Sequence, residues 1–231
     1  MMSQDAFRHI GVIVGFAREA SCLKRHKHCG RDVPLSVAMS GAEKSGALKA
    51  AQTLIDGGID ALMSFGVAGG LQDDVAVGDV VFADKIYHKD GVWMCHKAWS
   101  HALWARYASV PFARRGSVFG SDILVPEIAE KRALGERTGA LVVDMESHIG
   151  ACLAHRHGIP FMAVRAVVDR VDKAIPPVLY HVIAPDGSYD VGGVMKALLR
   201  RPWQVGSLIS LAYHMERAES ALVRVIQRGL F

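Results

Sequence analysis

Acidic residues at the ends of two predicted strands are the clearest sign of chemistry in this sequence. Asp144 and Glu146 follow one short apolar run, and Asp169 follows a second apolar run that also contains Arg165. A carboxylate at such a position is costly unless a ligand or a partner satisfies it. Two such acids can share the cleavage of a glycosidic bond, because one can hold sugar hydroxyls while the other donates a proton to the leaving group. The alternative interpretation is structural: a buried ion pair between Arg165 and an aspartate, with Asp144 capping the next helix.

Two other segments can hold an anion or approach a ligand. Ser40 and Glu43 have the spacing of a capping box at the start of a predicted helix, and the first amides of a helix also attract anions. The glycine-rich segment 66–70 follows a predicted strand and is expected to form a turn. It matches neither a phosphate-binding loop nor a dinucleotide fingerprint, so it predicts only a close approach of the backbone to a ligand or to another segment.

Histidines and cysteines occur together twice, but neither group predicts a metal site. The first group is Cys22, His26, His28 and Cys29. Its spacing fits no standard zinc pattern and its surroundings are basic, so we expect a solvated loop. The second group, His148, Cys152 and His155, shares one helix face and is expected to pack against a neighbour.

The elements that must position these residues alternate between strands and helices. The predicted strands are 10–14, 35–39, 61–65, 79–83, 117–119, 140–143 and 161–168. The predicted helices are 43–56, 126–137, 146–157, 193–201 and 203–228. This alternation predicts an α/β fold with helices on both faces of a sheet, and ligands bind at the carboxyl ends of such strands. We expect one domain over residues 1–231, with a basic helical extension from about residue 193.

The composition excludes several classes of protein. The 231 residues are 51% hydrophobic and 22% charged, which is an ordinary globular balance and argues against a disordered chain or a coiled coil. Apolar stretches fall short of the roughly 18 residues of a membrane span, and four irregularly spaced cysteines favour a cytoplasmic protein. The net charge of +4 lies almost wholly after residue 190, and it forms no basic stripe of the kind that binds nucleic acid.

Four motifs together resemble the nucleoside phosphorylase family, which includes purine and uridine phosphorylases and methylthioadenosine/S-adenosylhomocysteine nucleosidases. They are the glycine-rich segment 66–71, the run 77–81, Asp144-Met145-Glu146-Ser147 and the Arg165-to-Asp169 step. The similarity spans residues 8–175. In the C-terminal part, segments 174–177, 185–187 and 198–202 resemble the hopanoid-associated phosphorylases, which are similar to enzymes that remove adenine from adenosylhopane.

This resemblance implies a three-layer α/β/α sandwich around a mixed, partly barrel-like sheet, and no cofactor. It implies that Asp169 protonates N7 of the purine and that Glu146 binds ribose hydroxyls. Glu19 is the counterpart of the acid that orients an attacking water. The remaining implied substrate contacts are Met145 against the sugar, Leu124 and Val125 beside the base, Gly66 and Val67 in the glycine-rich segment, and Tyr87 and His88 offered to the site of a neighbouring subunit in a homodimer or higher oligomer.

The nucleophile is left open between phosphate and water. Purine nucleoside phosphorylases of this kind hold phosphate with an arginine and a serine near the glycine-rich segment, whereas this sequence has no arginine there and has Val67 in the place of the serine. Phosphate as co-substrate would have to use Gly15, Arg18, Ser40 and Gly41. If these residues do not bind phosphate, water attacks and the enzyme is a nucleosidase.

We therefore expect cleavage of an adenine nucleoside, with adenosylhopane as the first candidate. Methylthioadenosine/S-adenosylhomocysteine nucleosidase or another purine nucleoside phosphorylase is the second candidate, and a non-catalytic nucleoside- or lipid-binding module is the third. Apolar residues that can handle a lipid or touch a membrane are Trp93, Trp99, Trp104, Trp203, Leu208, Ile209, Leu211, Leu222 and Val223. Their alternative role is core packing and dimer contact.

Overall fold

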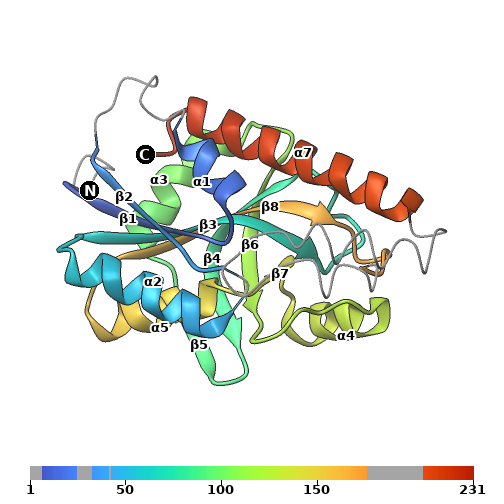
Figure 1. The fold of residues 1–231 in the computed structure, drawn as a ribbon, viewed down its shortest axis with the longest axis horizontal. Helices are drawn as coiled ribbons and strands as arrows, with labels where there is room; N and C mark the ends of the chain where they lie inside the picture. Colours follow the sequence, from blue (N-terminus) through green and yellow to red (C-terminus); the bar gives the residue numbers. More distant parts are fainter. Residues whose placement is uncertain (1–6, 25–32, 42, 176–204) are drawn as a thin grey trace.

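A mixed sheet of eight strands forms the centre of the protein in the computed structural model, which describes residues 7–24, 33–41, 43–175 and 205–231 (Figure 1). The strands are β1 (Ile10–Val14), β2 (Leu35–Met39), β3 (Ala61–Gly70), β4 (Val80–His88), β5 (Gly91–Met94), β6 (Ala113–Gly120), β7 (Val142–Asp144) and β8 (Phe161–Asp169). β1, β3 and β8 are almost wholly buried, as their uninterrupted apolar sequences require.

Helices cover both faces of the sheet, so the predicted three-layer α/β/α architecture is confirmed (Figure 1). The described helices are α1 (Ala17–Leu23), α2 (Lys44–Asp56), α3 (Lys97–Tyr107), α4 (Ile128–Thr138), α5 (Ser147–Arg156) and α7 (Val205–Gln227). α7 packs on β8 and α1 on one face, while α2 packs on α5 on the other.

The sheet closes partly on itself. Its strand order is β2-β1-β3-β7-β6-β4-β5, and β8 pairs with both β3 and β4. β8 runs parallel to β3 and antiparallel to β4. The ring formed by β3, β7, β6, β4 and β8 is the barrel-like part that the family resemblance implied.

The position of β3 in this ring brings two acid-bearing strand ends together. Gly69 of β3 pairs with Val143 on one side and with Asp169 on the other. Asp144 and Glu146 follow Val143 directly, so the carboxylates predicted from separate motifs lie on either side of one strand. A Cβ atom at Gly69 would lie 3.2 Å from Asp169 Oδ1, which explains the need for a small residue there.

Two local predictions are wrong. The glycine-rich segment 66–70 is not a turn: it continues β3, because β7 and β8 both pair with it. Ser40 does not cap α2, since its hydroxyl donates to the carbonyl oxygens of Val14 and Gly41 and the N-cap residue is Glu43.

Several elements were not predicted, and others lie outside the described residues. α1, α3 and β5 were missed, and β4 and β6 are longer than expected. The predicted helix 193–201, the start of the C-terminal extension, Trp203 and the segment with His26, His28 and Cys29 fall outside the described part of the chain. Cys22 is buried in α1.

Most of the candidate lipid-handling residues prove to be structural. Trp99 is buried, and Trp93 and Trp104 pack against the same core. Leu222 lies in the core and Val223 packs against it. Within the described ranges, no helix combines the length and the apolar character needed to cross a bilayer.

Candidate active site

A cavity of about 210 Å³ opens at the strand ends beside β3, where the sequence placed the site. It is somewhat smaller than the roughly 300–1,000 Å³ of typical small-molecule sites. Its charged lining residues are Lys131, Asp144, Glu146 and Asp169. Its other lining residues are uncharged and almost all apolar: Phe16, Val67, Ala68, Gly69, Ile123, Leu124, Val125, Val143, Met145, Val168, Ile175, Leu211 and Met215.

Arg165 organises the acids on the side of this cavity that Asp144 and Glu146 line. Its Nε lies 2.5 Å from Asp144 Oδ2, and its Nη2 lies 3.2 Å from Glu146 Oε2. It also donates to the hydroxyls of Ser64 and Ser147. The guanidinium is fully buried, because β8 is covered on both faces. The ion pair between Arg165 and Asp144 that we considered as a structural alternative is therefore present, and the same arginine also orients Glu146.

Burial controls the protonation of Glu146. Removal from water raises the pKa of this carboxyl group to about 8, against the opposing effect of the nearby Arg165 guanidinium. Asp144 and Glu19 raise it further, because they place more negative charge in the same volume. The site gathers three carboxyl groups around one guanidinium, so negative charge is in excess there even when Glu146 is protonated, and an incoming group with positive charge is favoured.

Glu19 lies in the first turn of α1, held by backbone amides. Its Oε2 accepts hydrogen bonds from the N–H groups of Gly15 at 2.6 Å and Phe16 at 3.0 Å, and its Oε1 accepts one from Val67 at 2.8 Å. Burial raises the pKa of Glu19, while Arg165 and these three amides oppose the increase. The structure thus joins Glu19 to the glycine-rich strand and to the Arg165 cluster, and its role toward an attacking water stays a prediction.

Asp169 lies at the end of β8 and contacts a buried lysine. Lys131 of α4 is completely buried, and its ammonium donates to Asp169 Oδ2 and to the carbonyl oxygen of Lys173 at 2.9 Å. Burial raises the pKa of Asp169, and Lys131 opposes this increase. Lys131 was not predicted. Its position could have indicated that it is buried, because it lies between Ile128 and Leu134 on the apolar face of a predicted helix.

Leu124 and Val125 line the cavity next to the acids, and Asp122 anchors the loop that carries them. Within the described part of the chain, the backbone N–H groups of Leu124 and Val125 donate to no other residue, so they are free to bind a ligand. The Asp122 carboxylate lies 2.8 Å from Lys44 Nζ on α2 and 2.8 Å from Lys89 Nζ.

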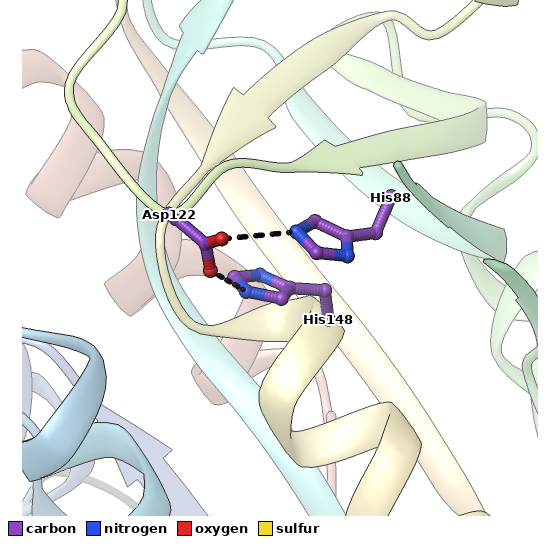
Figure 2. Close-up of side chains that lie close together, drawn as sticks. All are labelled: His88, Asp122 and His148. Carbon is purple, nitrogen blue, oxygen red and sulfur yellow. Dashed lines mark hydrogen bonds and ion pairs between the residues drawn. The ribbon is translucent and has the colours of Figure 1, made fainter. Parts of the chain in front are cut away.

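Two histidines complete the surroundings of Asp122 (Figure 2). His148 Nε2 lies 3.2 Å from Asp122 Oδ1, and His88 Nε2 lies 3.6 Å from Oδ2. The two imidazole rings are stacked with centroids 4.3 Å apart. These three residues have ligand types that bind metal ions. However, two ammonium groups already contact the carboxylate, and nearly parallel rings do not aim their nitrogens at one point, so we interpret the cluster as a charge network that holds the loop.

The donors considered for phosphate are engaged elsewhere. The Gly15 N–H donates to Glu19, and the Gly41 N–H donates to the Gly15 carbonyl at 3.1 Å. The Ser40 N–H donates to Val14 at 2.8 Å. Arg18 pairs with Glu219 of α7, with its Nε 2.6 Å from Oε1. The structure does not assemble these groups into an anion site.

Tyr87 and His88 stand at the end of β4. Tyr87 packs against the small cluster that contains Val125 and Val143. The His88 side chain is only 4% exposed and faces Asp122 of its own subunit, so it is not displayed at the surface. The role of this segment at a neighbouring subunit's site stays a prediction.

A profile of the phosphorylase superfamily matches residues 18–179. The chain belongs to the phosphorylase superfamily. This membership identifies it as an enzyme that acts on the N-glycosidic bonds of nucleosides.

Solved structures share the fold of this superfamily chain at low sequence identity. The futalosine hydrolase of Helicobacter pylori aligns with a TM-score of 0.72 at 14% identity, over 96% of both chains. A 5′-methylthioadenosine/S-adenosylhomocysteine nucleosidase from Neisseria meningitidis, in complex with methylthio-immucillin-A, gives a TM-score of 0.70 at 17% identity over 96% of this chain and 97% of the other. The corresponding enzyme from S. pneumoniae, with a transition-state inhibitor, gives 0.67 at 18% identity over 95% and 98%. A search of the curated proteins finds no match.

Proposed function

We propose that this superfamily enzyme hydrolyses an adenine nucleoside that carries a large apolar 5′ substituent, and that adenosylhopane is its substrate. The observation that carries the proposal is the apolar cavity with Glu146 in its wall on one side of β3 and Asp169 on the other. Adenine and ribosylhopane are then the products.

The acids around Arg165 act on the sugar. Breaking the bond between C1′ and the base leaves positive charge on the ribosyl group. Asp144 and Glu19 carry more negative charge than Arg165 neutralises even when Glu146 is protonated, so this buried cluster stabilises that charge as it develops. Glu146 also accepts hydrogen bonds from the ribose hydroxyls, and Met145 packs against the ring.

Asp169 acts on the base. Adenine is a poor leaving group as an anion, and a proton delivered to N7 lets it leave as a neutral molecule. Proton transfer from a positioned acid typically contributes about 10²–10⁴-fold in rate. The amides of Leu124 and Val125 are placed to hold the edge of the purine, and the Asp122 network fixes their loop.

Water is the nucleophile in this proposal. The amides of Gly15 and Val67, which an anionic co-substrate would need, are bound to Glu19. Glu19 accepts three backbone hydrogen bonds that hold its carboxylate beside the sugar site, where it can orient a water molecule for attack.

The apolar side of the cavity supports a hydrophobic 5′ substituent. Phe16, Ile123, Leu211 and Met215 contribute to its wall. Ile123 is 67% exposed, and Ile209, two residues before Leu211 in α7, is 65% exposed. Together with the C-terminal similarity to hopanoid-associated phosphorylases, this surface supports a polycyclic lipid over a small polar group.

Assembly and membrane contact belong to the same proposal. β5 is an edge strand on which Val92 is 53% exposed and Met94 is 70% exposed, directly after Tyr87 and His88. We propose that this edge forms a homodimer contact and that the first turns of α7 touch the membrane that holds the lipid. Light scattering and flotation with anionic vesicles measure these two properties.

The test is release of the free purine base, measured by chromatography, from adenosylhopane, 5′-methylthioadenosine, S-adenosylhomocysteine and futalosine. We expect the highest kcat/KM for adenosylhopane. Asp169→Asn and Glu146→Gln should each lose at least about 10²-fold. Asp172→Asn, which changes an exposed aspartate paired with Arg170, is the matched control and should retain activity.

The other outcomes separate the alternatives. Faster cleavage of the two soluble adenine nucleosides would make the protein a methylthioadenosine/S-adenosylhomocysteine nucleosidase. Adenine binding without turnover, unchanged by Asp169→Asn, would make it a binding module.

A further inference from the structure

Lys131 is a buried lysine with a complete set of partners. It lies in the first half of α4, and its side chain has no exposed surface. Its ammonium donates to Asp169 Oδ2, to the Lys173 carbonyl at 2.9 Å and to the Arg170 carbonyl at 3.4 Å. An ammonium has three protons, and each has an acceptor here. A buried ammonium requires such partners. One of them is Asp169, the acid that acts on the base in the proposed reaction.

This pairing changes how Asp169 can work. The ammonium favours the ionised form of Asp169, which has no proton to donate, whereas burial favours the protonated form. In either case the pair holds one proton that can move along the hydrogen bond between Lys131 Nζ and Asp169 Oδ2. The cavity wall includes both residues, so the pair faces the position of the base.

We propose that Lys131 is the positioning residue that supplies the proton which Asp169 delivers to the purine. This inference rests on the proposed function. As the bond between C1′ and N9 breaks, its electron pair stays with the base. One proton passes from Lys131 Nζ to the Asp169 carboxylate and from Asp169 to N7. Adenine leaves neutral, Lys131 is left as a neutral amine, and the amine regains a proton from water after the product departs.

Other groups that face Asp169 are few in the described part of the chain. His214 of α7 lies close enough to lower the pKa of Asp169, and β3 presents only Gly69. His214 is half-buried, and it is the second ionisable side chain near this acid. His214→Gln is therefore the control for any effect of pH.

The test compares two leaving groups. Adenine in adenosylhopane needs a proton to leave, whereas nitrophenolate in p-nitrophenyl β-D-ribofuranoside leaves without one. We expect Lys131→Met to lose at least about 10²-fold in kcat with adenosylhopane and less than about threefold with the nitrophenyl riboside. Asp169→Asn should show the same selectivity, and Lys131→Arg should not recover the loss, because a guanidinium restores the positive charge but keeps its proton.

The pH profile of kcat is the second readout. The wild-type enzyme should lose activity at alkaline pH when the pair gives up its proton. Without the ammonium, that limb should move to lower pH by more than one unit in Lys131→Met, and it should stay in place in His214→Gln. Methionine keeps the length and apolar stem of lysine. If this variant does not fold, Lys131→Arg decides: its guanidinium keeps the charge but gives up no proton, so the loss with adenosylhopane should persist.

Two results would overturn the inference while the proposed function stands. One is an equal loss of kcat on both substrates, which would mean that Lys131 only holds residues 170–173 in place. The other is an alkaline limb that does not move in any Lys131 variant. Failure of the wild-type enzyme to release adenine at all would instead reject the proposed function.

Discussion

Glu19 Oε1 accepts a hydrogen bond from the backbone N–H of Val67 at 2.8 Å, across 48 positions of sequence. Through this contact α1 places the Glu19 carboxylate against the backbone amides of the glycine-rich strand β3. The carboxylate occupies the amides that an external anion would otherwise use. The relationship between these two residues thus bears directly on the choice of nucleophile.

Phosphate should have no effect on turnover. Adenine release from adenosylhopane should stay within about twofold between phosphate-free buffer and tens of millimolar phosphate, and Glu19→Gln should lower kcat by at least about 10²-fold because it weakens the base that orients water. The sugar product, identified by mass spectrometry, should carry no phosphate. A phosphorylated product would show that the anion displaces Glu19 from its amides.

Gly66→Ala should damage the site even though alanine is small. The added Cβ would lie 2.4 Å from Glu19 Oε1 and 2.7 Å from Arg165 Nη1, so both buried groups would have to move. We expect a loss of about 1–3 kcal/mol in unfolding free energy from overpacking, together with a fall in kcat. Gly91→Ala is the matched control, because its Cβ would meet only the Trp93 ring at 3.6 Å. Equal stability of both variants in urea denaturation would contradict the geometry around Gly66.

Stability should fall as the pH rises from about 5 to 8. The folded pKa of Glu146, about 8, is above the ordinary value of 4.5, so within this window the folded state binds a proton that the unfolded state has lost. One such group lowers the unfolding free energy by up to roughly 1.4 kcal/mol per pH unit. Glu146→Gln cannot titrate, so its melting temperature should depend less on pH. A wild-type melting temperature that rises across this window would refute the assignment.

Asp122→Asn should weaken substrate binding more than chemistry. The change removes the charge that Lys44 and Lys89 contact, and the loop with Leu124 and Val125 loses its anchor. We expect KM to rise by up to about tenfold while kcat changes less, since solvent weakens the pairs with the exposed lysines but their loss together frees the loop. Asp90→Asn, at an exposed aspartate beside His88, is the control. A fall in kcat at constant KM would place Asp122 closer to the chemistry than the structure does.

Within α7, substitution of Leu211 should affect substrate specificity, whereas substitution of Leu222 should affect stability. Leu211 lines the cavity, whereas Leu222 is completely buried in the core. Leu222→Ala should lower the unfolding free energy by about 2–5 kcal/mol. Leu211→Ala should leave the melting temperature nearly unchanged and raise KM for substrates with an apolar 5′ group. Similar melting curves for the two variants would argue against this division.

The sequence predicted the layers of the fold and the place of the site because those depend on local patterns. Buried parallel strands appear as continuous apolar runs, as in 10–14 and 161–168, and acids at strand ends stand out against them. The glycines at 66–70 were misinterpreted because a turn and a strand that must leave space for Glu19 and Asp169 both require small residues.

The features that escaped prediction depend on distant partners. Lys131 is an unremarkable residue in a charged helix until Asp169, 38 positions later, is placed against it. The Asp122 network joins residues of β4, α2 and α5, which no local pattern connects. Such contacts follow from the closure of the sheet through β8.

α7 combines two duties along its length. Its last turns fill the core with Ala221, Leu222 and Val225, while Leu211 and Met215 nearer its start face the cavity. Because its last turns hold α7 in the core, residues near its start can be replaced with less effect on folding. Related enzymes can therefore acquire new substrates through substitutions near the start of α7, while the acids that act on the glycosidic bond stay unchanged.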